Sequence, residues 1–356
     1  MNHPYQCYRE ILTQREAWEE AVEVVLAQEK AIRTFFQTNR PDQIIFAGCT
    51  SPYYAGKSAA DYWQSITGIP TRAVPCSELI QFPETYYSGK LGKPVLMVLS
   101  RSGKTSETIW AVEEFEERFP GRIVYIGNAP ESVLARKANL KILIPMGAED
   151  SMPQTRSFSV MYLAALMVGA LLANQAETLD ILKNSPVVVD PVIQSVEPVI
   201  KNIFMNRSFQ NIFYLGSGPL HGIALEATLK MIEMSLSNVL CFPVLESRHG
   251  PKSLIDENSM VVALYSHGGL NYEADLMTEL TRVHHATTVA ITPDAKWNTG
   301  EVSYKLPVNC AWPDGILGLS YLPVIQLLAY HLACSKGVDP DSPRNLTAYI
   351  EIGVTR

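Results

Sequence analysis

Hydrophobic positions along the chain change their spacing near residue 40. Before it, apolar side chains recur every three or four residues, which predicts one or two amphipathic helices that bury one face: Ile11, Trp18, Ala21, Val24, Val25, Ile32, Phe35 and Phe36. After residue 40, short β-branched apolar runs alternate with helical stretches. This alternation is typical of an α/β fold in which helices cover both faces of a parallel sheet.

The apolar runs occur twice in the same order. Three pairs of equivalent runs are offset by 168, 166 and 165 residues: Phe46 with Tyr214, Ser100 with Ser266, and Ile123 with Thr288. A fourth pair joins the runs 140–145 and 302–307. Such similar offsets predict two copies of one domain.

The repeat sets the expected domain organisation. We expect a helical segment over residues 1–40, a first domain over 41–175, a linker helix over 176–205, a second domain over 206–335, and a C-terminal tail over 336–356 that closes the site.

A turn rich in hydroxyl groups follows the apolar run 94–99. It reads Ser100-Arg-Ser-Gly-Lys-Thr-Ser-Glu-Thr and leads into a helical segment over 107–119. Backbone N–H groups and the positive end of a helix dipole stabilise a phosphate at such a place, and hydroxyls donate to its oxygens. The spacing is not that of a P-loop. One hydroxyl would be enough to cap an unliganded helix, so several favour a bound anion.

The equivalent turn in the second half has a different chemistry. Ser266-His-Gly-Gly-Leu-Asn-Tyr-Glu-Ala-Asp has fewer hydroxyls and carries the acids Glu273 and Asp275. We therefore expect a phosphate in the first half alone.

The second half instead carries candidate acid–base residues. Glu226, Lys230 and Glu233 share one face of a helix predicted over 220–236, and His249 follows Glu233 by 16 residues. One interpretation is a ladder of ion pairs on a solvated face, with a structural histidine before Gly250-Pro251. The other is a carboxylate base and a histidine acid that move a proton between neighbouring carbons of a sugar. The residues alone leave both open.

Composition excludes several classes of protein. The 356 residues carry a net charge of −7 without a run of Lys or Arg, which argues against a nucleic-acid partner. Six scattered cysteines without a C-x-x-C pair indicate free thiols in a reducing cytoplasm and no zinc site. The N-terminus lacks the apolar stretch of a signal peptide. The apolar run 160–172, taken as the longest, is too short to cross a membrane.

Six short motifs, in this order, resemble those of proteins with tandem SIS (sugar isomerase) domains. They span nearly the whole chain: Gly48-Cys-Thr-Ser, Ser100-Arg-Ser-Gly-Lys-Thr-Ser-Glu-Thr, Thr155-Arg-Ser-Phe, Leu225-Glu-Ala-Thr-Leu-Lys-Met-Ile-Glu, Glu246-Ser-Arg-His-Gly-Pro and Pro343-Arg-Asn-Leu. The chain resembles stand-alone glucosamine-6-phosphate deaminase/isomerases and the isomerase half of glucosamine-6-phosphate synthase. The resemblance implies two tandem SIS domains, each a three-layer, flavodoxin-like α/β/α sandwich with a parallel sheet.

The resemblance also implies roles for individual residues. The phosphate of a sugar-phosphate substrate would be held by Ser51, Ser100, Arg101, Ser102 and Thr105, with Thr108 lining the pocket less directly. Glu233 would shuttle the proton and His249 would open the sugar ring, while Glu226 and Lys230 would line the sugar and position the base. In this family the histidine serves the neighbouring subunit's site, which implies a homodimer. No metal and no cofactor are expected.

One departure from the family narrows the expected reaction. The synthase has a lysine two residues after its Pro-Arg-Asn-Leu motif, and this chain has Ala348 there. No cysteine follows the initiator methionine, so we expect no glutaminase activity and no synthesis. We expect an isomerising deaminase of an amino-hexose 6-phosphate. The alternatives are a fructosamine 6-phosphate deglycase, a plain aldose/ketose phosphosugar isomerase, and a sugar-phosphate sensor without catalytic activity.

Overall fold

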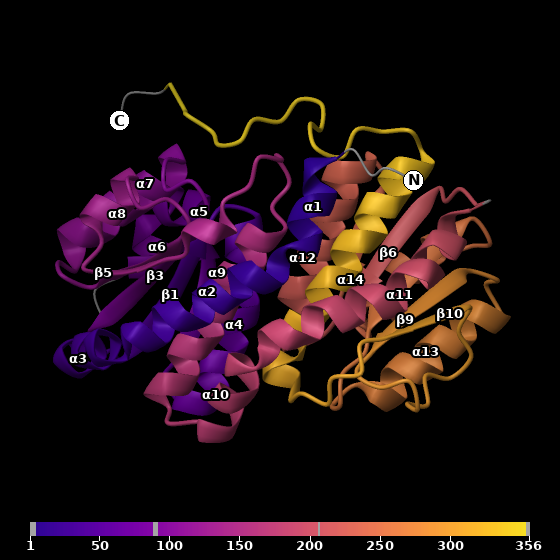
Figure 1. Ribbon diagram of the computed structural model, residues 1–356, viewed down its shortest axis with the longest axis horizontal. Helices are drawn as coiled ribbons and strands as arrows, with labels where there is room; N and C mark the ends of the chain where they lie inside the picture. The colour runs from indigo at the N-terminus through magenta and orange to yellow at the C-terminus, as the bar shows by residue number, and fades with distance from the viewer. Residues whose placement is uncertain (1–4, 88–91, 206, 354–356) are drawn as a thin grey trace. The chain divides into compact units, whose positions relative to one another are not determined.

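The computed structural model describes residues 5–87, 92–205 and 207–353, which form two compact units (Figure 1). The first-sheet unit comprises Thr13–Glu149, Arg156–Pro186 and Leu346–Arg356. The second-sheet unit comprises Met1–Leu12, Asp150–Thr155 and Val187–Asn345. Each unit is therefore assembled from three separate stretches of sequence.

The two terminal segments are divided between the units, which differs from the predicted boundaries. Helix α1 (Gln6–Leu12) belongs to the second-sheet unit because the N–H groups of Gln6 and Cys7 donate to the carboxylate of Asp341, at 2.7 and 2.8 Å. The residues from Leu346 onward belong to the first-sheet unit. Such contacts across the sequence cannot be inferred from local hydrophobic spacing.

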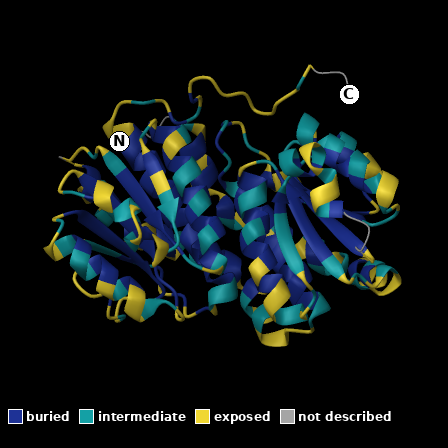
Figure 2. Ribbon diagram, turned by 180° about the vertical axis from the view of Figure 1, so that it is seen from behind, coloured by how far each residue is buried: buried dark blue, intermediate teal, exposed yellow. Residues whose placement is uncertain are grey.

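The first sheet has five strands in the order β2-β1-β3-β4-β5, and every pairing is parallel. Its strands are β1 (Gln43–Gly48), β2 (Thr71–Pro75), β3 (Pro94–Ser100), β4 (Ile123–Gly127) and β5 (Leu140–Leu143). All residues of β3 and β4 are buried (Figure 2). A parallel sheet covered on both faces requires such unbroken apolar strands.

The second sheet repeats this topology. Its strands are β6 (Asn211–Leu215), β7 (Val239–Phe242), β8 (Ser259–Leu264), β9 (Thr287–Thr292) and β10 (Tyr304–Pro307). The order β10-β9-β8-β6-β7 equals that of the first sheet when the strands are counted from β6, and the pairings are again parallel. The predicted α/β class is confirmed. Strands β2 and β7 were not predicted.

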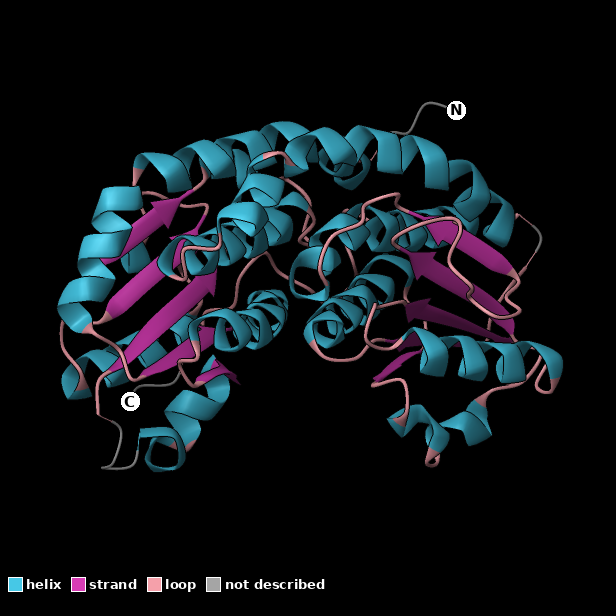
Figure 3. Ribbon diagram, turned by 90° about the horizontal axis from the view of Figure 1, so that it is seen from below, coloured by secondary structure: helices cyan, strands magenta, loops and turns pink. Residues whose placement is uncertain are grey.

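Helices flank both sheets (Figure 3). In the first-sheet unit they are α2 (Gln14–Ala27), α3 (Glu29–Asn39), α4 (Ser51–Thr67), α5 (Cys76–Gln81), α6 (Pro83–Tyr87), α7 (Ser106–Arg118), α8 (Val133–Lys137), α9 (Arg156–Leu172) and α10 (Ala176–Lys183). In the second-sheet unit they are α1, α11 (Val189–Phe204), α12 (Pro219–Ser235), α13 (Leu270–Arg282) and α14 (Asp314–Ser335). Short 3₁₀ turns lie at Pro145–Gly147, Ser185–Val188, Glu246–Arg248 and Pro251–Leu254.

One almost wholly buried helix lies at the core of each unit. Helix α9 packs against α2 and α4, and the indole N–H of Trp63 in α4 donates to the carbonyl of Ala165 at 2.8 Å. Helix α14 packs against α11 and α12. At 22 residues, α14 is apolar enough to cross a membrane, but its apolar window is completely buried inside the protein. It is longer than the predicted run 160–172, and polar members such as Gln326 and His331 interrupt its apolar sequence.

Candidate functional site

The hydroxyl-rich turn joins β3 to α7 and is held in shape by its own groups. The N–H of Gly103 donates to Ser100 Oγ at 3.1 Å, and the N–H of Lys104 donates to Ser102 Oγ at 3.2 Å. Gly103 has a φ of +59°, and a Cβ there would lie 2.3 Å from Ser132 Oγ, so glycine is required. Thr105 is the N-cap residue of α7, yet its hydroxyl makes no capping hydrogen bond. The turn is therefore more than a simple helix cap.

A second loop with a predicted phosphate residue lies next to this turn. Strand β1 lies between β2 and β3 in the sheet. The strand order therefore reverses between β1 and β3. Ligands of parallel α/β sheets bind beyond the carboxyl ends of the strands at such a point. Ser51, which is 2% exposed, starts α4 after β1. The two loops are linked by Cys49 Sγ and Thr108 Oγ1, which are 3.3 Å apart.

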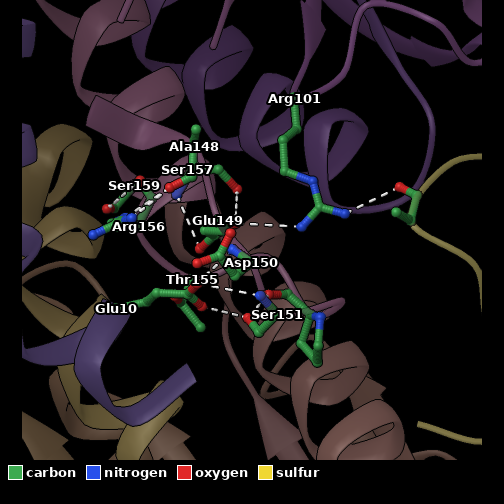
Figure 4. Close-up of polar contacts among 12 residues, drawn as sticks. Glu10, Arg101, Ala148, Glu149, Asp150, Ser151, Thr155, Arg156, Ser157 and Ser159 are labelled. Carbon is green, nitrogen blue, oxygen red and sulfur yellow. Dashed lines mark hydrogen bonds and ion pairs between the residues drawn. The ribbon is translucent and has the colours of Figure 1, made fainter. Parts of the chain in front are cut away.

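Arg101 is held by groups of its own unit (Figure 4). Its guanidinium lies 3.4 Å from the buried carboxylate of Glu149 and donates to the carbonyl of Ala348 at 3.0 Å. Glu149 also accepts hydrogen bonds from the backbone and hydroxyl of Ser157. The guanidinium is thus fixed beside the hydroxyl turn.

The C-terminal segment contacts the same turn. Ser106 donates its N–H to Ile350 O at 3.1 Å and accepts the N–H of Ile352 on its Oγ at 3.0 Å. The ammonium of Lys104 lies 5.7 Å from the ring centroid of Tyr349. Ser106 and Lys104 were within the predicted motif but had no role assigned. No local signal pairs them with residues nearly 250 positions away.

The motif Thr155-Arg-Ser-Phe supports the backbone of both units. Arg156 donates to the carbonyl of Ala148 at 3.0 Å and to Thr13 Oγ1 at 2.9 Å in the first-sheet unit. In the second-sheet unit, Gln326 donates to the carbonyl of Thr155 at 3.1 Å. Glu10, which the sequence did not single out, accepts the N–H of Asp150 at 2.7 Å (Figure 4).

The predicted acid–base residues of α12 form a buried cluster. Lys230 Nζ lies 2.5 Å from Glu233 Oε2 and 3.5 Å from Glu226 Oε1. The side chains of Lys230 and Glu226 are each 1% exposed, and that of Glu233 is 18% exposed. Both ion pairs of the proposed ladder form, but the face is not solvated. A buried ion pair costs free energy of desolvation, so this cluster is weak evidence for a purely stabilising role.

His249 does not share the burial of this cluster. It is exposed, follows the 3₁₀ turn Glu246–Arg248, and makes no side-chain hydrogen bond to the three α12 residues where the structure describes them. Ion pairs fix its loop, because Arg248 contacts Asp275 at 2.6 Å and Glu279 at 2.5 Å. A hydrogen bond from Lys252, opposed in part by burial, lowers the pKa of Glu279.

The turn after β8, equivalent to the hydroxyl turn, is filled by carboxylates of its own unit. Ser266 donates its N–H and its hydroxyl to Glu273, at 2.9 and 2.8 Å. His267 and Gly268 donate their N–H groups to Asp314 at 2.7 and 2.9 Å. These acids border a cavity of about 310 Å³ in the second-sheet unit, whose lining includes Pro219, Leu220, Val244 and Tyr272.

This arrangement refines the expected difference between the two turns. Glu273 accepts from the turn, as its position suggested, whereas Asp275 turns to Arg248. Asp314 could not be foreseen, because it comes from the start of α14. In the part of the chain that the structure describes, no group of three or more His, Cys, Asp or Glu side chains could hold a metal ion.

The fold and the two turns define a duplicated α/β protein with paired parallel sheets. Residues 39–173 match the SIS domain family. The chain is 28% identical over 326 residues to a glutamine–fructose-6-phosphate aminotransferase (isomerizing) of Legionella pneumophila (strain Lens). The alignment covers 87% of this chain and 51% of that protein. The chain spans about half the length of the curated relatives it matches first.

Two solved structures have the same fold. A tagatose-6-phosphate ketose/aldose isomerase from Escherichia coli has a TM-score of 0.87 at 24% identity, with 96% of each chain covered. A glucosamine-6-phosphate deaminase from Thermotoga maritima has a TM-score of 0.71 at 23% identity, covering 93% of this chain and 99% of that one. At these identities the likeness establishes the fold alone.

The buried Glu273 generates a prediction about stability. Burial raises its pKa from 4.5 to about 7, against the opposing hydrogen bonds from Ser266. Because the folded state then holds a proton that the unfolded state releases, stability falls as the pH rises from 4.5 to 7. We expect Glu273→Gln to gain up to about 3 kcal/mol over the wild type between pH 5 and pH 8.

Urea unfolding of both proteins at the two pH values measures this difference. Glu257→Gln, at an exposed position of the same unit, serves as the control and should leave the pH dependence unchanged. If Glu273→Gln and the wild type differ by the same amount at both pH values, the buried carboxyl does not titrate as described.

Proposed function

We propose that this protein is a phosphosugar isomerase that isomerises and deaminates an amino-hexose 6-phosphate. The observation that carries the proposal is the buried cluster of Glu226, Lys230 and Glu233. A carboxylate that an ammonium group holds in a fixed position, and that is partly shielded from water, suits proton transfer between neighbouring carbons. The names of similar proteins support the same class of reaction: an isomerizing aminotransferase, a ketose/aldose isomerase and a deaminase, each named for a sugar phosphate.

The reaction uses each group in order. His249, supplied to the neighbouring subunit of a homodimer, donates the proton that opens the sugar ring. Glu233 removes the proton at C2 and returns it at C1, which converts the enolamine into an imine at C2. Water adds to C2 and ammonia leaves, giving the ketose phosphate. Lys230 and Glu226 position Glu233 and line the sugar.

The phosphate is assigned to the hydroxyl turn of the first-sheet unit. Ser51, Ser100, Ser102 and Thr105 offer hydroxyls at the N-termini of α4 and α7, and Thr108 lies beneath them. A helix N-terminus with free donors favours an anion. Arg101 adds a positive charge nearby, although Glu149 partly offsets it. The C-terminal segment then covers this turn during catalysis.

The proposal includes the cellular setting. The six cysteines are all free, in keeping with a reducing cytoplasm. The reaction requires neither a metal nor a cofactor.

A panel of substrates tests the reaction. We expect ammonia and a ketose phosphate from a hexosamine 6-phosphate. A free amino acid from a fructosamine 6-phosphate would indicate a deglycase instead, and a ketose phosphate from a neutral aldose 6-phosphate would indicate a plain isomerase. Binding of sugar phosphates without turnover of any of them would indicate a sensor.

Glu233→Gln tests the proton shuttle. We expect turnover to fall by a factor on the order of 10² or more, with substrate affinity nearly unchanged, because the amide keeps the shape but cannot accept the proton. Steady-state kinetics and calorimetric binding measure the two effects. Glu257→Gln is the matched control on the same unit. Wild-type turnover in Glu233→Gln would refute the role of Glu233.

Ser102→Ala and Thr105→Ala test the phosphate turn. Each should raise KM for phosphorylated sugars by roughly tenfold, since a neutral or charge-assisted hydrogen bond contributes about 1–3 kcal/mol. Unphosphorylated sugars should be affected far less. Ser195→Ala, at an exposed position of α11, is the control. Equal effects on both kinds of sugar would place the phosphate elsewhere.

A further inference from the structure

Two cysteines lie at the ends of neighbouring strands beside the hydroxyl turn. Gly48 and Pro75, the last residues of β1 and β2, are partners in the parallel register. Cys49 directly follows β1, and Cys76, the first residue of α5, directly follows β2. Neighbouring strands are about 4.8 Å apart, which lies within the roughly 4.4–6.8 Å between the Cα atoms of disulfide-linked residues.

The two thiols interact, and their environments differ. A hydrogen bond from the Cys76 thiol lowers the pKa of Cys49, and one with Thr108 adds to this, although burial and the nearby Glu107 carboxylate oppose both. The same hydrogen bond, together with complete burial, raises the pKa of Cys76. Cys49 is partly exposed and Cys76 is fully buried. Of the two hydrogen-bonded thiols, Cys49 therefore belongs to the more accessible residue.

We propose that Cys49 and Cys76 form a peroxide-sensitive dithiol pair that closes into a disulfide. The Cys49 thiolate attacks one oxygen of hydrogen peroxide, the O–O bond breaks, and Cys49 becomes a sulfenic acid while water is released. The Cys76 sulfur then attacks the Cys49 sulfur, the S–O bond breaks, and a second water leaves. Two thiols and one peroxide give one disulfide and two waters.

The disulfide would change the neighbouring loop. Cys49 Sγ now lies 3.3 Å from Thr108 Oγ1, the contact that links the loop after β1 to α7. Turning Cys49 toward Cys76 removes that contact and moves the chain two residues before Ser51. If the phosphate binds at this turn, as the proposed function has it, the disulfide lowers the affinity for sugar phosphates. Only this consequence rests on the proposed function.

The remaining cysteines have different surroundings. Burial raises the pKa of Cys310 to about 11. Cys7 is buried, and burial also raises its pKa. Cys334 is exposed and Cys241 is partly exposed, so both report on unselective oxidation.

Peptide mapping of the full chain tests the proposal. The protein is treated with hydrogen peroxide, blocked with N-ethylmaleimide and digested without reduction. We expect a linked peptide containing Cys49 and Cys76, which dithiothreitol reverses. Cys76→Ser should give no link and should instead carry a sulfenic acid on Cys49 that dimedone traps. Cys310→Ser is the matched control and should form the link as the wild type does.

The outcomes separate the two proposals. Oxidation of Cys241 or Cys334 without a Cys49–Cys76 link overturns the dithiol pair. A link that lowers the affinity for a hexosamine 6-phosphate on the order of tenfold, restored by dithiothreitol, supports both proposals. A link with unchanged affinity supports the dithiol pair and overturns the assignment of the phosphate to this turn. Cys49→Ser, at the partly exposed position, should also form no link. It keeps the test valid if Cys76→Ser fails to fold.

Discussion

A parallel sheet must be covered on both faces, and this constraint organises both units. The strands of each sheet are apolar and buried, so each needs helices on two sides. Helices α9 and α14 lie at the centres of the helical layers of the two units, and almost all their residues are buried. Once the helices are in place, every strand must run in the same direction, and all loops that follow the strands meet at one edge. In the first-sheet unit, the hydroxyl-rich turn after β3 lies at that edge.

Duplication has given this edge two different uses. In the first-sheet unit, the turn after β3 keeps its hydroxyls, and Thr105 has no capping bond to its own helix. In the second-sheet unit, carboxylates of Glu273 and Asp314 accept the donors of the equivalent turn. Equivalent turns thus accept internal carboxyl groups in one copy and keep a hydroxyl-rich sequence in the other. The cluster of Glu226, Lys230 and Glu233 lies on the copy whose turn is bonded to these carboxyl groups.

The repeat, the strands of the sheet interiors and the α12 cluster could be predicted from the sequence. Each depends on local spacing: runs of apolar residues for the strands, and intervals of three and four for Glu226, Lys230 and Glu233. The burial of the charged residues of α12 could not be predicted, because their spacing is equally typical of a solvated face and burial depends on packing with elements distant in sequence. The partners of Arg101 could not be predicted either, because Ala348 and Glu149 are distant from it in sequence.

The bonds from Gln6 and Cys7 to Asp341 bear on how the chain is made. They join residues 335 and 334 positions apart and tie α1 into the second-sheet unit. During synthesis α1 leaves the ribosome long before Asp341, which follows it by more than 300 residues. Neither unit can acquire all its segments while the chain is still short, so the order of synthesis does not match the order of assembly. Apolar strands that are made early therefore stay without part of their covering until the later segments are made, and such exposed strands are prone to aggregate.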